Sequence, residues 1–347
     1  MKVTLIPGRE LGPDLFGRWR ELQRSNLDLA SPYFCPEFTQ AIASVRDDVE
    51  VAVVEDEGSI TAFLPFQRGH DSVGIPVGGI ISDYQGLICA PEFACDPREL
   101  IKQCRLLAWD FDHLISAQRM FAPFHRYAES SPVMNLNAGF ERYVAACHAA
   151  RAERVKIRRL ERVLGSVQLV VATTDKELLN QVLKWKSAHY LQTSSRDLFS
   201  IGWIRAAVER IHATQTPDFA GILSVLYAGG VTVAGHFGMR AGCVWHYWFP
   251  SYAPEYSRYS PGLVLLLKMA EDAAAVGLRT IDLGKGKMLY KDRFKNSEVP
   301  LAEGSVELLS VVKLQRQLHR TMRALTRPAR QMVRSALRAR GVHGSGK

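Results

Sequence analysis

Hydrophobic positions in the first 137 residues follow two spacings, one typical of strands and one typical of helices. Apolar runs at 49–55 and 60–66 flank the polar turn at 56–59, and this pattern predicts a β-hairpin. At 13–24 the apolar residues recur at helical spacing. The other elements expected here are a strand at 3–6, helices at 36–45 and 97–109, a strand at 113–117 and an apolar run at 131–136.

The second half repeats this order more clearly. A strand at 167–172 and two helices precede three apolar runs, and Gly229-Gly230 predicts a two-residue hairpin turn between the first two runs. A strand that feeds a helix and then another strand implies a parallel crossover beside an antiparallel meander. Such a mixed sheet splays where its strands diverge, and the gap can admit a ligand. The elements are helices at 176–191 and 201–212, strands at 221–228, 231–239 and 243–249, a helix at 261–276, a strand at 280–283 and a helix at 287–294.

Two halves of this kind predict two domains, as expected for a chain of 347 residues. We expect a mixed α/β (α+β) fold in which each domain has a mostly antiparallel sheet flanked by helices. One long helix, at 140–164, connects the halves. The boundaries are 1–137 for the N-terminal domain, 138–165 for the linking helix, 166–307 for the C-terminal domain and 308–347 for a basic helical or flexible tail.

The element order of the second half resembles that of the GNAT acetyltransferases. Several segments bring the match closer, among them Asp-Leu-Gly-Lys-Gly at 282–286 and Tyr-Lys-Asp-Arg-Phe at 290–294. Others lie at 158–165, 183–186, 221–226, 233–240 and 259–262, with weaker ones at 31–38 and 82–87. Together they resemble the bacterial acetyltransferases of the cellulose-biosynthesis (CelD/BcsL) group. Those are double-GNAT proteins distantly similar to the Fem-type peptidoglycan aminoacyl transferases.

The resemblance spans about residues 10–305 and implies tandem GNAT-like domains. It also implies an enzyme that transfers an acyl group, usually from acetyl-CoA, to an amine or hydroxyl of a sugar or of a cell-envelope or exopolysaccharide precursor. The nucleophile would attack the thioester directly. Two alternatives stay open, a Fem-like aminoacyl-tRNA-dependent transferase and a non-catalytic GNAT-like scaffold in polysaccharide synthesis. A nucleic acid is expected only as tRNA in the first alternative.

A donor site is expected where the helix at 261–276 begins. Ser260 suits the N-cap, Pro261 suits the first helical position, and Gly262 lets a ligand approach the backbone. Free amides and the positive end of the helix dipole there could hold the pyrophosphate of CoA, beside Arg258 and Tyr259. The segment departs from the glycine-rich GNAT pattern, and Pro261 removes one donor. An aminoacyl-tRNA or another anionic donor therefore stays open, as does a plain helix start.

Three residues are candidates for proton transfer. His236 and His246 lie on neighbouring predicted strands. A three-residue turn at 240–242 puts them opposite each other, whereas a two-residue turn puts His236 opposite Tyr247. Either arrangement could supply a general base, because histidine titrates near neutrality; a sheet-face histidine bonded to a neighbour is the alternative. The resemblance implies that Tyr290 protonates the leaving thiolate, and an aromatic anchor is the alternative reading.

Further candidates would bind the substrates. Asp83, in a glycine-rich loop with Tyr84, could hold the acceptor across the interdomain cleft, or simply form an Asx turn. Trp248 belongs to an aromatic cluster whose exposed part could stack on sugar rings. Asp282 could orient a nearby group or cap a turn. Lys291 could meet donor phosphates or an acidic sugar, or lie solvated at the surface.

Charge and cysteine usage narrow the class of protein. The net charge is +9, but residues 308–347 hold ten Lys and Arg and no Asp or Glu, so residues 1–307 carry −1. The tail is spaced for a basic amphipathic helix that could lie on an anionic membrane, with a solvated tail as the alternative. The six cysteines form no C-x-x-C pair or zinc-ligand spacing, and we expect no metal. Without a membrane span or signal peptide, a cytoplasmic protein is expected, with a peripheral position at the inner membrane as an option.

Overall fold

Strands from both halves of the chain form one continuous sheet in the computed structural model, which describes residues 1–193, 195–286 and 288–308. Over these residues the strand order is β1-β2-β3-β4-β6-β13-β7-β12-β11-β10-β9-β8, with β5 paired to β3. Most pairs are antiparallel. The exceptions are β4 with β6 and β11 with β12. The expected mixed α/β class with a mostly antiparallel sheet flanked by helices is confirmed.

The first half follows the predicted alternation of strands and helices. Its hairpin pairs β2 with β3, as the apolar runs indicate. The bounds are β1 Lys2–Pro7, α1 Pro13–Ser25, α2 Pro36–Ala43, β2 Val49–Asp56, β3 Ser59–Arg68, β4 Val73–Ile75, β5 Ile88–Cys89, α3 Pro97–Gln103, β6 Ala108–Ile115 and β7 His125–Asn135.

The second half contains the predicted meander and crossover. Ala228 pairs with Val231, which confirms the two-residue turn at Gly229-Gly230. The bounds are α4 Phe140–Ala146, α5 His148–Leu164, β8 Val167–Val170, α6 Lys176–Gln192, α7 Gly202–Ala213, β9 Phe219–Ala228, β10 Val231–Ala241, β11 Val244–Tyr252, α8 Pro261–Ala275, β12 Thr280–Asp282, α9 Leu289–Phe294 and β13 Ser297–Glu307.

Two predicted helices have different bounds in the structure. The helix expected at 97–109 stops at Gln103, because Trp109 belongs to β6 and is buried against Phe111 and Phe121. The single helix expected at 140–164 is two helices, α4 and α5, which meet at the extended residue Cys147. Its thiol donates to the carbonyl of Arg293 at 3.3 Å and holds the break beside α9. The basic tail lies outside the described residues, apart from its first residue.

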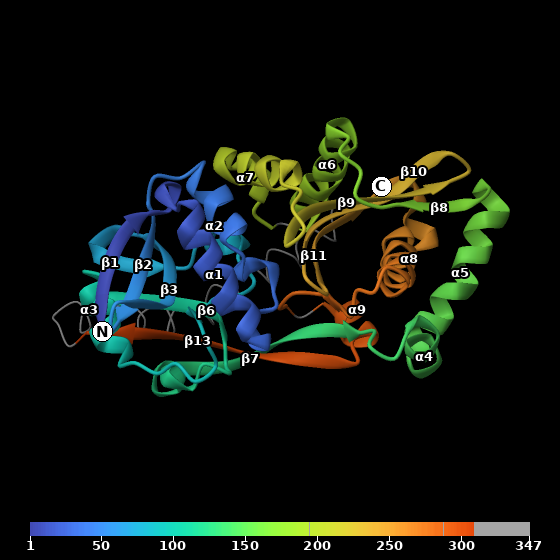
Figure 1. Ribbon diagram of the computed structural model, residues 1–347. Helices are drawn as coiled ribbons and strands as arrows, with labels where there is room; N and C mark the ends of the chain where they lie inside the picture. The colour runs from blue at the N-terminus through green and yellow to red at the C-terminus, as the bar shows by residue number, and fades with distance from the viewer. Residues whose placement is uncertain (194, 287, 309–347) are drawn as a thin grey trace, which may run out of the picture.

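Strand β13 was not expected, and it joins the two halves. It pairs with β6 on one side and with β7 on the other, while β7 also pairs with β12. Figure 1 shows β7 and β13 running along the molecule between the two groups of strands. The last strand among the described residues therefore completes the sheet that the first half begins.

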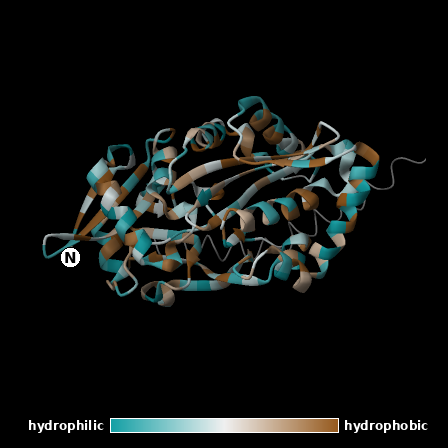
Figure 2. Ribbon diagram, turned by 45° about the vertical axis from the view of Figure 1, so that its right-hand side comes forward, coloured by the Kyte–Doolittle hydropathy of each residue, from teal (hydrophilic) through white to brown (hydrophobic). Residues whose placement is uncertain are grey.

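Helices cover both faces of the sheet. Buried residues of α1, α2, α6 and α7 share one apolar cluster that spans the two halves. Residues of α4, α5 and α8 form a second cluster on the other face of the C-terminal half, and α3 covers a third in the N-terminal half. Figure 2 shows hydrophilic and hydrophobic residues interspersed along the helices. Within the described ranges, none of the helices combines the length and apolar character that a membrane span requires.

The predicted parallel crossover from β11 through α8 to β12 is confirmed, and its strands diverge early. Pairing between β11 and β12 covers only Val244, Trp245 and His246, the last of which lies beside Asp282. Strand β11 continues to Tyr252 without this partner. His246 and Asp282 thus stand at the point where the sheet splays.

Candidate active site

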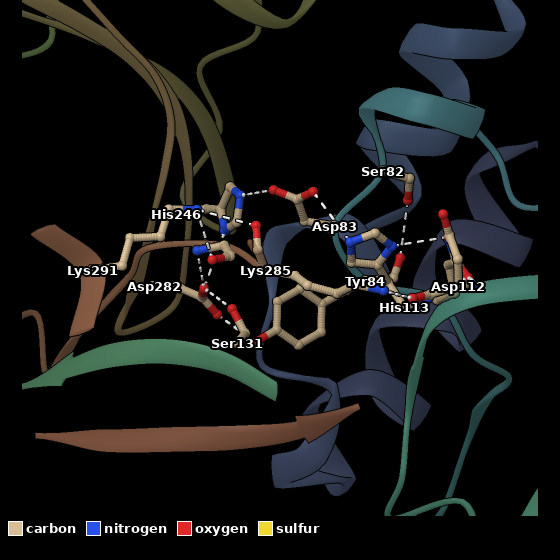
Figure 3. A network of polar contacts seen from close by, with 12 residues as sticks. Ser82, Asp83, Tyr84, Asp112, His113, Ser131, His246, Asp282, Lys285 and Lys291 are labelled. Atoms are coloured by element: carbon tan, nitrogen blue, oxygen red, sulfur yellow. Dashed lines mark hydrogen bonds and ion pairs between the residues drawn. The ribbon is translucent and has the colours of Figure 1, made fainter. Parts of the chain in front are cut away.

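The site is built around a contact between the two halves of the chain. Oδ2 of Asp83 lies 2.9 Å from Nε2 of His246, 163 positions along the sequence. The loop that carries Asp83 is fixed by its neighbour Gln85, whose backbone amide donates to His113 and whose carbonyl accepts from Ile115, both on β6. Figure 3 shows Asp83 reaching from this loop toward the imidazole.

A second carboxylate stands on the far side of His246. Asp282 Oδ1 lies 3.7 Å from Nδ1 of the imidazole. The Asp282 carboxylate also accepts hydrogen bonds from the Tyr84 hydroxyl, from Ser131 Oγ at 2.7 Å and from the amide of Gly284 at 2.8 Å. The imidazole is 0% exposed, whereas the side chain of Asp83 is 25% exposed. Asp83 is therefore the member of the pair that a ligand can reach.

The other oxygen of Asp83 faces His113. Nε2 of His113 lies 3.7 Å from Asp83 Oδ1, and its Nδ1 lies 2.9 Å from Asp112. Burial raises the pKa of Asp83, but the hydrogen bond from His246 and the nearby histidines and Lys291 outweigh it. The pKa of Asp83 therefore falls below its ordinary value, and the carboxylate is ionised at neutral pH.

Lys291 and Tyr290 lie next to this network. The Lys291 ammonium donates to the carbonyls of Gly284 at 2.8 Å and Lys285 at 3.1 Å, so it is not a solvated surface lysine. Burial lowers the pKa of Lys291, although Asp83 and Asp282 oppose that shift. Burial and then the charge of Asp83 raise the pKa of Tyr290, which keeps the phenol protonated at neutral pH.

Neither predicted register of the two histidines is correct. The turn closes one residue later than expected, because Ala241 pairs with Val244, and a bulge between Phe237 and Met239 shifts the strands further. His246 lies opposite Met239, and His236 lies opposite Pro250. The two side chains are consequently not a cross-strand pair.

His236 is placed away from Asp83. It is fully buried, stacks on Tyr247 with ring centroids 4.6 Å apart, and accepts a hydrogen bond from the amide of Trp248 at 3.1 Å. Burial lowers the pKa of His236 well below its ordinary value. A neutral histidine bonded to its neighbouring strand fits these contacts, and of the two histidines only His246 bonds to Asp83.

The proposed donor segment has an unusual backbone. Ser260 has φ 54° and ψ 46°, the left-handed conformation, and makes no side-chain cap, so the expected N-cap bond is absent. Its hydroxyl instead accepts from Lys156 of α5 at 3.3 Å. The Arg258 guanidinium lies 4.7 Å from the ring centroid of Tyr259, and the Gly262 carbonyl accepts from Tyr247. Pro261 opens α8 as predicted.

The aromatic candidates are largely internal. Tyr84 is buried, and its hydroxyl is engaged by Asp282. Trp248 is half-buried, stacks on Phe249 and forms a T-shaped contact with Tyr33. Tyr33 in turn packs edge-on against His246, 4.9 Å between centroids. These rings form an apolar wall on one side of the imidazole.

Among the described residues, no group of three or more His, Cys, Asp and Glu side chains is arranged to hold a metal ion.

Comparison with known proteins identifies the second half. Residues 149–292 match the family model described as an acetyltransferase (GNAT) domain. These residues, less than half of the chain, are a GNAT acetyltransferase domain by this match. The prediction that the protein is an acyltransferase is thereby confirmed, whereas the cellulose-biosynthesis subtype stays a prediction. No curated protein matches the sequence.

Solved structures resemble the chain over most of its length. FemX is 10% identical with a TM-score of 0.60 and covers 91% of this chain and 99% of its own. The C-terminal domain of a putative lysylphosphatidylglycerol synthetase from Agrobacterium fabrum is 14% identical, with a TM-score of 0.56 over 86% and 95% of the chains. A tandem GNAT protein from the clavulanic acid biosynthesis pathway is 11% identical, with a TM-score of 0.50 over 88% and 98%. At these identities the likeness shows the fold, and it confirms the tandem GNAT-like architecture.

The GNAT domain alone does not complete the site. Asp83, Tyr84 and Ser131 all lie before residue 149, yet they bond to His246 or Asp282. Ser131 and His113 were not among the predicted residues. No local pattern marks them, because their contacts arise from the pairing of β7 with β12 and from the loop beside β6.

Gly284 lies against the Asp83–His246 pair, where a side chain would not fit. Its φ is +71°, and a Cβ there would lie 2.8 Å from Asp83 Oδ2 and 3.4 Å from a carbon of His246. We expect Gly284→Ala to lower stability by about 1–2 kcal/mol through its left-handed backbone. Displacement of Asp83 should also lower kcat for acyl transfer by about 10²-fold.

Gly277→Ala is the matched control, because φ is +81° there and no atom lies within 4 Å of the added Cβ. That variant should lose stability and keep its activity. Urea unfolding and acyl-transfer rates measure both effects. Equal activity of the two variants would show that Gly284 matters only for its backbone.

Proposed function

We propose that the protein transfers an acyl group, in the first instance acetyl from acetyl-CoA, to an amine of a sugar or of a cell-envelope or exopolysaccharide precursor. The observation that supports this is the Asp83–His246 pair at the splay between β11 and β12. An ionised carboxylate there can accept a hydrogen bond from an amine that enters between the halves. The proposal extends the GNAT assignment to a donor and an acceptor.

In the proposed reaction the acceptor nitrogen attacks the thioester carbonyl carbon. As the nitrogen–carbon bond forms, the nitrogen gives a proton to Asp83, whose carboxylate is held in position by the 2.9 Å contact with His246. The carbon–sulfur bond then breaks, and Tyr290 gives its phenolic proton to the leaving thiolate. The phenol of Tyr290 is protonated at neutral pH, so it holds the proton that this step needs.

The beginning of α8 supports a place for the phosphates of the donor. The guanidinium of Arg258 lies at this end of the helix, where the backbone dipole also favours an anion. The ammonium of Lys156 lies there too, but it is already paired with Glu153 at 2.8 Å. Over the described residues, Arg258 is held by the ring of Tyr259 and by no carboxylate. Lys291, nearer to Asp83, would face the thioester end.

One observation favours the second candidate, an aminoacyl-tRNA as donor. Pro261 offers no amide, and the Ser260 hydroxyl is already bonded to Lys156, so this loop offers fewer donors than a glycine-rich one. A measurement of which donor binds therefore decides between acetyl-CoA and aminoacyl-tRNA. A membrane role for the basic tail stays a prediction, since those residues lie outside the part that the structure describes.

Calorimetric titration with acetyl-CoA tests the proposal. We expect the wild-type protein to bind it, and Tyr290→Phe to bind equally well while release of CoA thiol falls by about 10²-fold with an amino-sugar acceptor such as glucosamine. Tyr127→Phe, an exposed tyrosine on β7, is the control and should change neither quantity. Absence of heat at millimolar acetyl-CoA, with tight and strongly salt-dependent binding of aminoacyl-tRNA, would replace acyl-CoA by the second donor.

A further inference from the structure

His113 takes no part in the proposed reaction, yet its ring joins Asp83 to the surface. It lies on β6, and its backbone is fixed by the loop that carries Asp83. The His113 amide donates to Gln85 Oε1 at 3.0 Å, and the His113 carbonyl accepts from the Gln85 amide at 3.0 Å. Figure 3 shows the ring between the carboxylates of Asp83 and Asp112. The His113 side chain is 14% exposed and that of Asp112 is 53% exposed, so this line of polar groups leads outward.

The contact with Asp112 indicates which ring nitrogen of His113 carries the proton. Gln85 Oε1 accepts from two backbone amides, so its Nε2 is the atom that donates to Asp112 Oδ1 at 2.6 Å. Burial raises the pKa of Asp112, but hydrogen bonds from His113 and Gln85 and the charge of Lys285 outweigh it, and the carboxylate is ionised. A carboxylate only accepts, so His113 Nδ1, 2.9 Å from the same oxygen, donates. Nε2 of the neutral ring is then left with a lone pair.

The two histidines beside Asp83 differ in what they present to it. His246 Nε2 lies 2.9 Å from Asp83 Oδ2, and because that carboxylate is ionised, the nitrogen is the donor and already holds a proton. His113 Nε2 lies 3.7 Å from Asp83 Oδ1, beyond hydrogen-bond distance, which fits a lone pair that faces an anionic oxygen. A proton on Oδ1 would turn this contact into a hydrogen bond. Of the two nitrogens that face Asp83, the one on His113 can therefore accept a proton.

A histidine behind the carboxylate answers a weakness of Asp83 as a base. Aspartate ordinarily titrates near pH 4 and histidine near pH 6.5. Folding lowers the pKa of Asp83 below its ordinary value, so a proton on this carboxylate is held weakly at neutral pH. General base catalysis is most effective when the base titrates near the working pH. An imidazole that receives the proton from Asp83 meets this condition, and Asp112 stabilises the imidazolium that results.

We propose that the base of the reaction is the pair Asp83–His113, in which the proton of the acceptor nitrogen passes through Asp83 to Nε2 of His113. The nitrogen loses its proton to Oδ1 of Asp83, the new O–H bond breaks as the proton moves to Nε2, and Asp83 is again a carboxylate. The imidazolium, paired with Asp112, returns the proton to solvent after the product has left. This inference rests on the proposed acyl transfer, and His113 acts in it through Asp83 rather than on the acceptor.

Other charged groups face this part of β6. Lys285, which follows β12, donates to the Asp112 carbonyl at 2.6 Å. On β13, Glu303 lies at the bulge opposite Asp112 and His113, and Asp110, two residues along β6, accepts from Ser305 at 2.6 Å. Carboxylates and lysines ordinarily titrate outside the range of about pH 5.5–7.5 in which histidine does. The difference between wild type and a His113 variant in that range therefore isolates the imidazole.

The state of the ring is tested without any turnover. The full-length protein is labelled with ¹⁵N-histidine, and NMR of the ring nitrogens identifies which one carries the proton in the neutral form; the resonances of His113 are those lost in His113→Asn. We expect His113 to carry its proton on Nδ1. Exposed His70 is the internal reference and should show the Nε2-protonated form that free histidine prefers. A neutral His113 protonated at Nε2 would overturn the proposal, whether or not acyl transfer is found.

His113→Asn gives the kinetic readout, because its amide can still donate to Asp112 but offers Asp83 no basic nitrogen. We expect kcat near pH 7.5 to fall by about 10–10²-fold and the rise of kcat between about pH 5.5 and 7.5 to disappear, while acetyl-CoA affinity changes less than threefold. His70→Asn is the matched control and should keep the wild-type profile. A His113→Asn kcat within threefold of wild type, with the rise intact, contradicts the relay. Absence of acyl transfer in wild type, by contrast, counts against the proposed function, and the ring tautomer still decides the role of His113.

Rescue separates proton transfer from simple packing. His113→Ala leaves a hollow between Asp83 and Asp112, and we expect added imidazole to restore kcat at least tenfold. Thiazole, a ring of similar shape that is a much weaker base, should restore little. Equal restoration by the two rings would show that His113 only fills space beside Asp83.

Discussion

Replacement of Asp83 by Asn is expected to lower kcat for acyl transfer by about 10²–10⁴-fold, the range for loss of a positioned general base. The amide keeps the shape of the side chain but can no longer take a proton from the acceptor, and its contact with His246 becomes a neutral one. Binding of acetyl-CoA should change less than threefold, because the donor phosphates are expected at the beginning of α8. Progress curves for CoA release and calorimetry measure the two quantities.

Asp71→Asn is the control for Asp83→Asn, since Asp71 is exposed on the same half of the chain. Acidification adds a second readout. Because folding lowers the pKa of Asp83, its ionised form stabilises the fold above the unfolded pKa, and that contribution is lost as pH falls through the lower folded value. When the pH is lowered below about 4, the free energy of unfolding should therefore fall less for Asp83→Asn than for wild type. Retention of kcat within threefold would remove Asp83 from the mechanism.

Glu37→Gln is expected to give the largest loss of stability, about 1.5–3 kcal/mol, the usual contribution of a hydrogen bond to a charged group. Glu37 on α2 is 5% exposed and pairs with Arg20 of α1, which also reaches Asp218 at 3.5 Å in the second half. Thr216 donates to the same Glu37 oxygen at 3.3 Å. The substitution leaves Arg20 without its buried partner at the contact between the halves.

Urea unfolding of Glu37→Gln should be compared with Glu21→Gln, whose exposed carboxylate pairs with Arg18 along α1. The exposed pair should contribute less than about 1 kcal/mol. If the two variants unfold with the same free energy, Glu37 does not hold the halves together.

Sequence pattern predicted the elements whose stabilising contacts are local. The hairpin of β2 and β3, the turn at Gly229-Gly230 and the crossover through α8 follow from apolar spacing, glycine in left-handed turns and proline at a first helical position. Strand β13 was not predicted, because its first four residues are exposed or half-exposed and show no alternation of buried and exposed positions. Only its pairing with β6 and β7 makes it a strand.

For the candidate site too, the sequence predicted some residues but not the contacts between them. His246 and Asp282 lie on elements that the resemblance placed correctly in order, yet their relation depended on a bulge that the sequence does not mark. Asp83 was expected to face the acceptor, and its contact with His246 could not be derived because it joins residues 163 positions apart.

The position of β13 has a consequence for synthesis of the chain. Strand β13 lies between β6 and β7 in the sheet. Once the ribosome has synthesised β7, which ends at Asn135, it must add about 160 more residues before β13 can pair with these two strands. At ordinary elongation rates this delay is on the order of ten seconds. During that interval β6 and β7 present unpaired edges, which invite chaperones or other chains. The N-terminal half, although made first, is therefore expected to acquire its final form last.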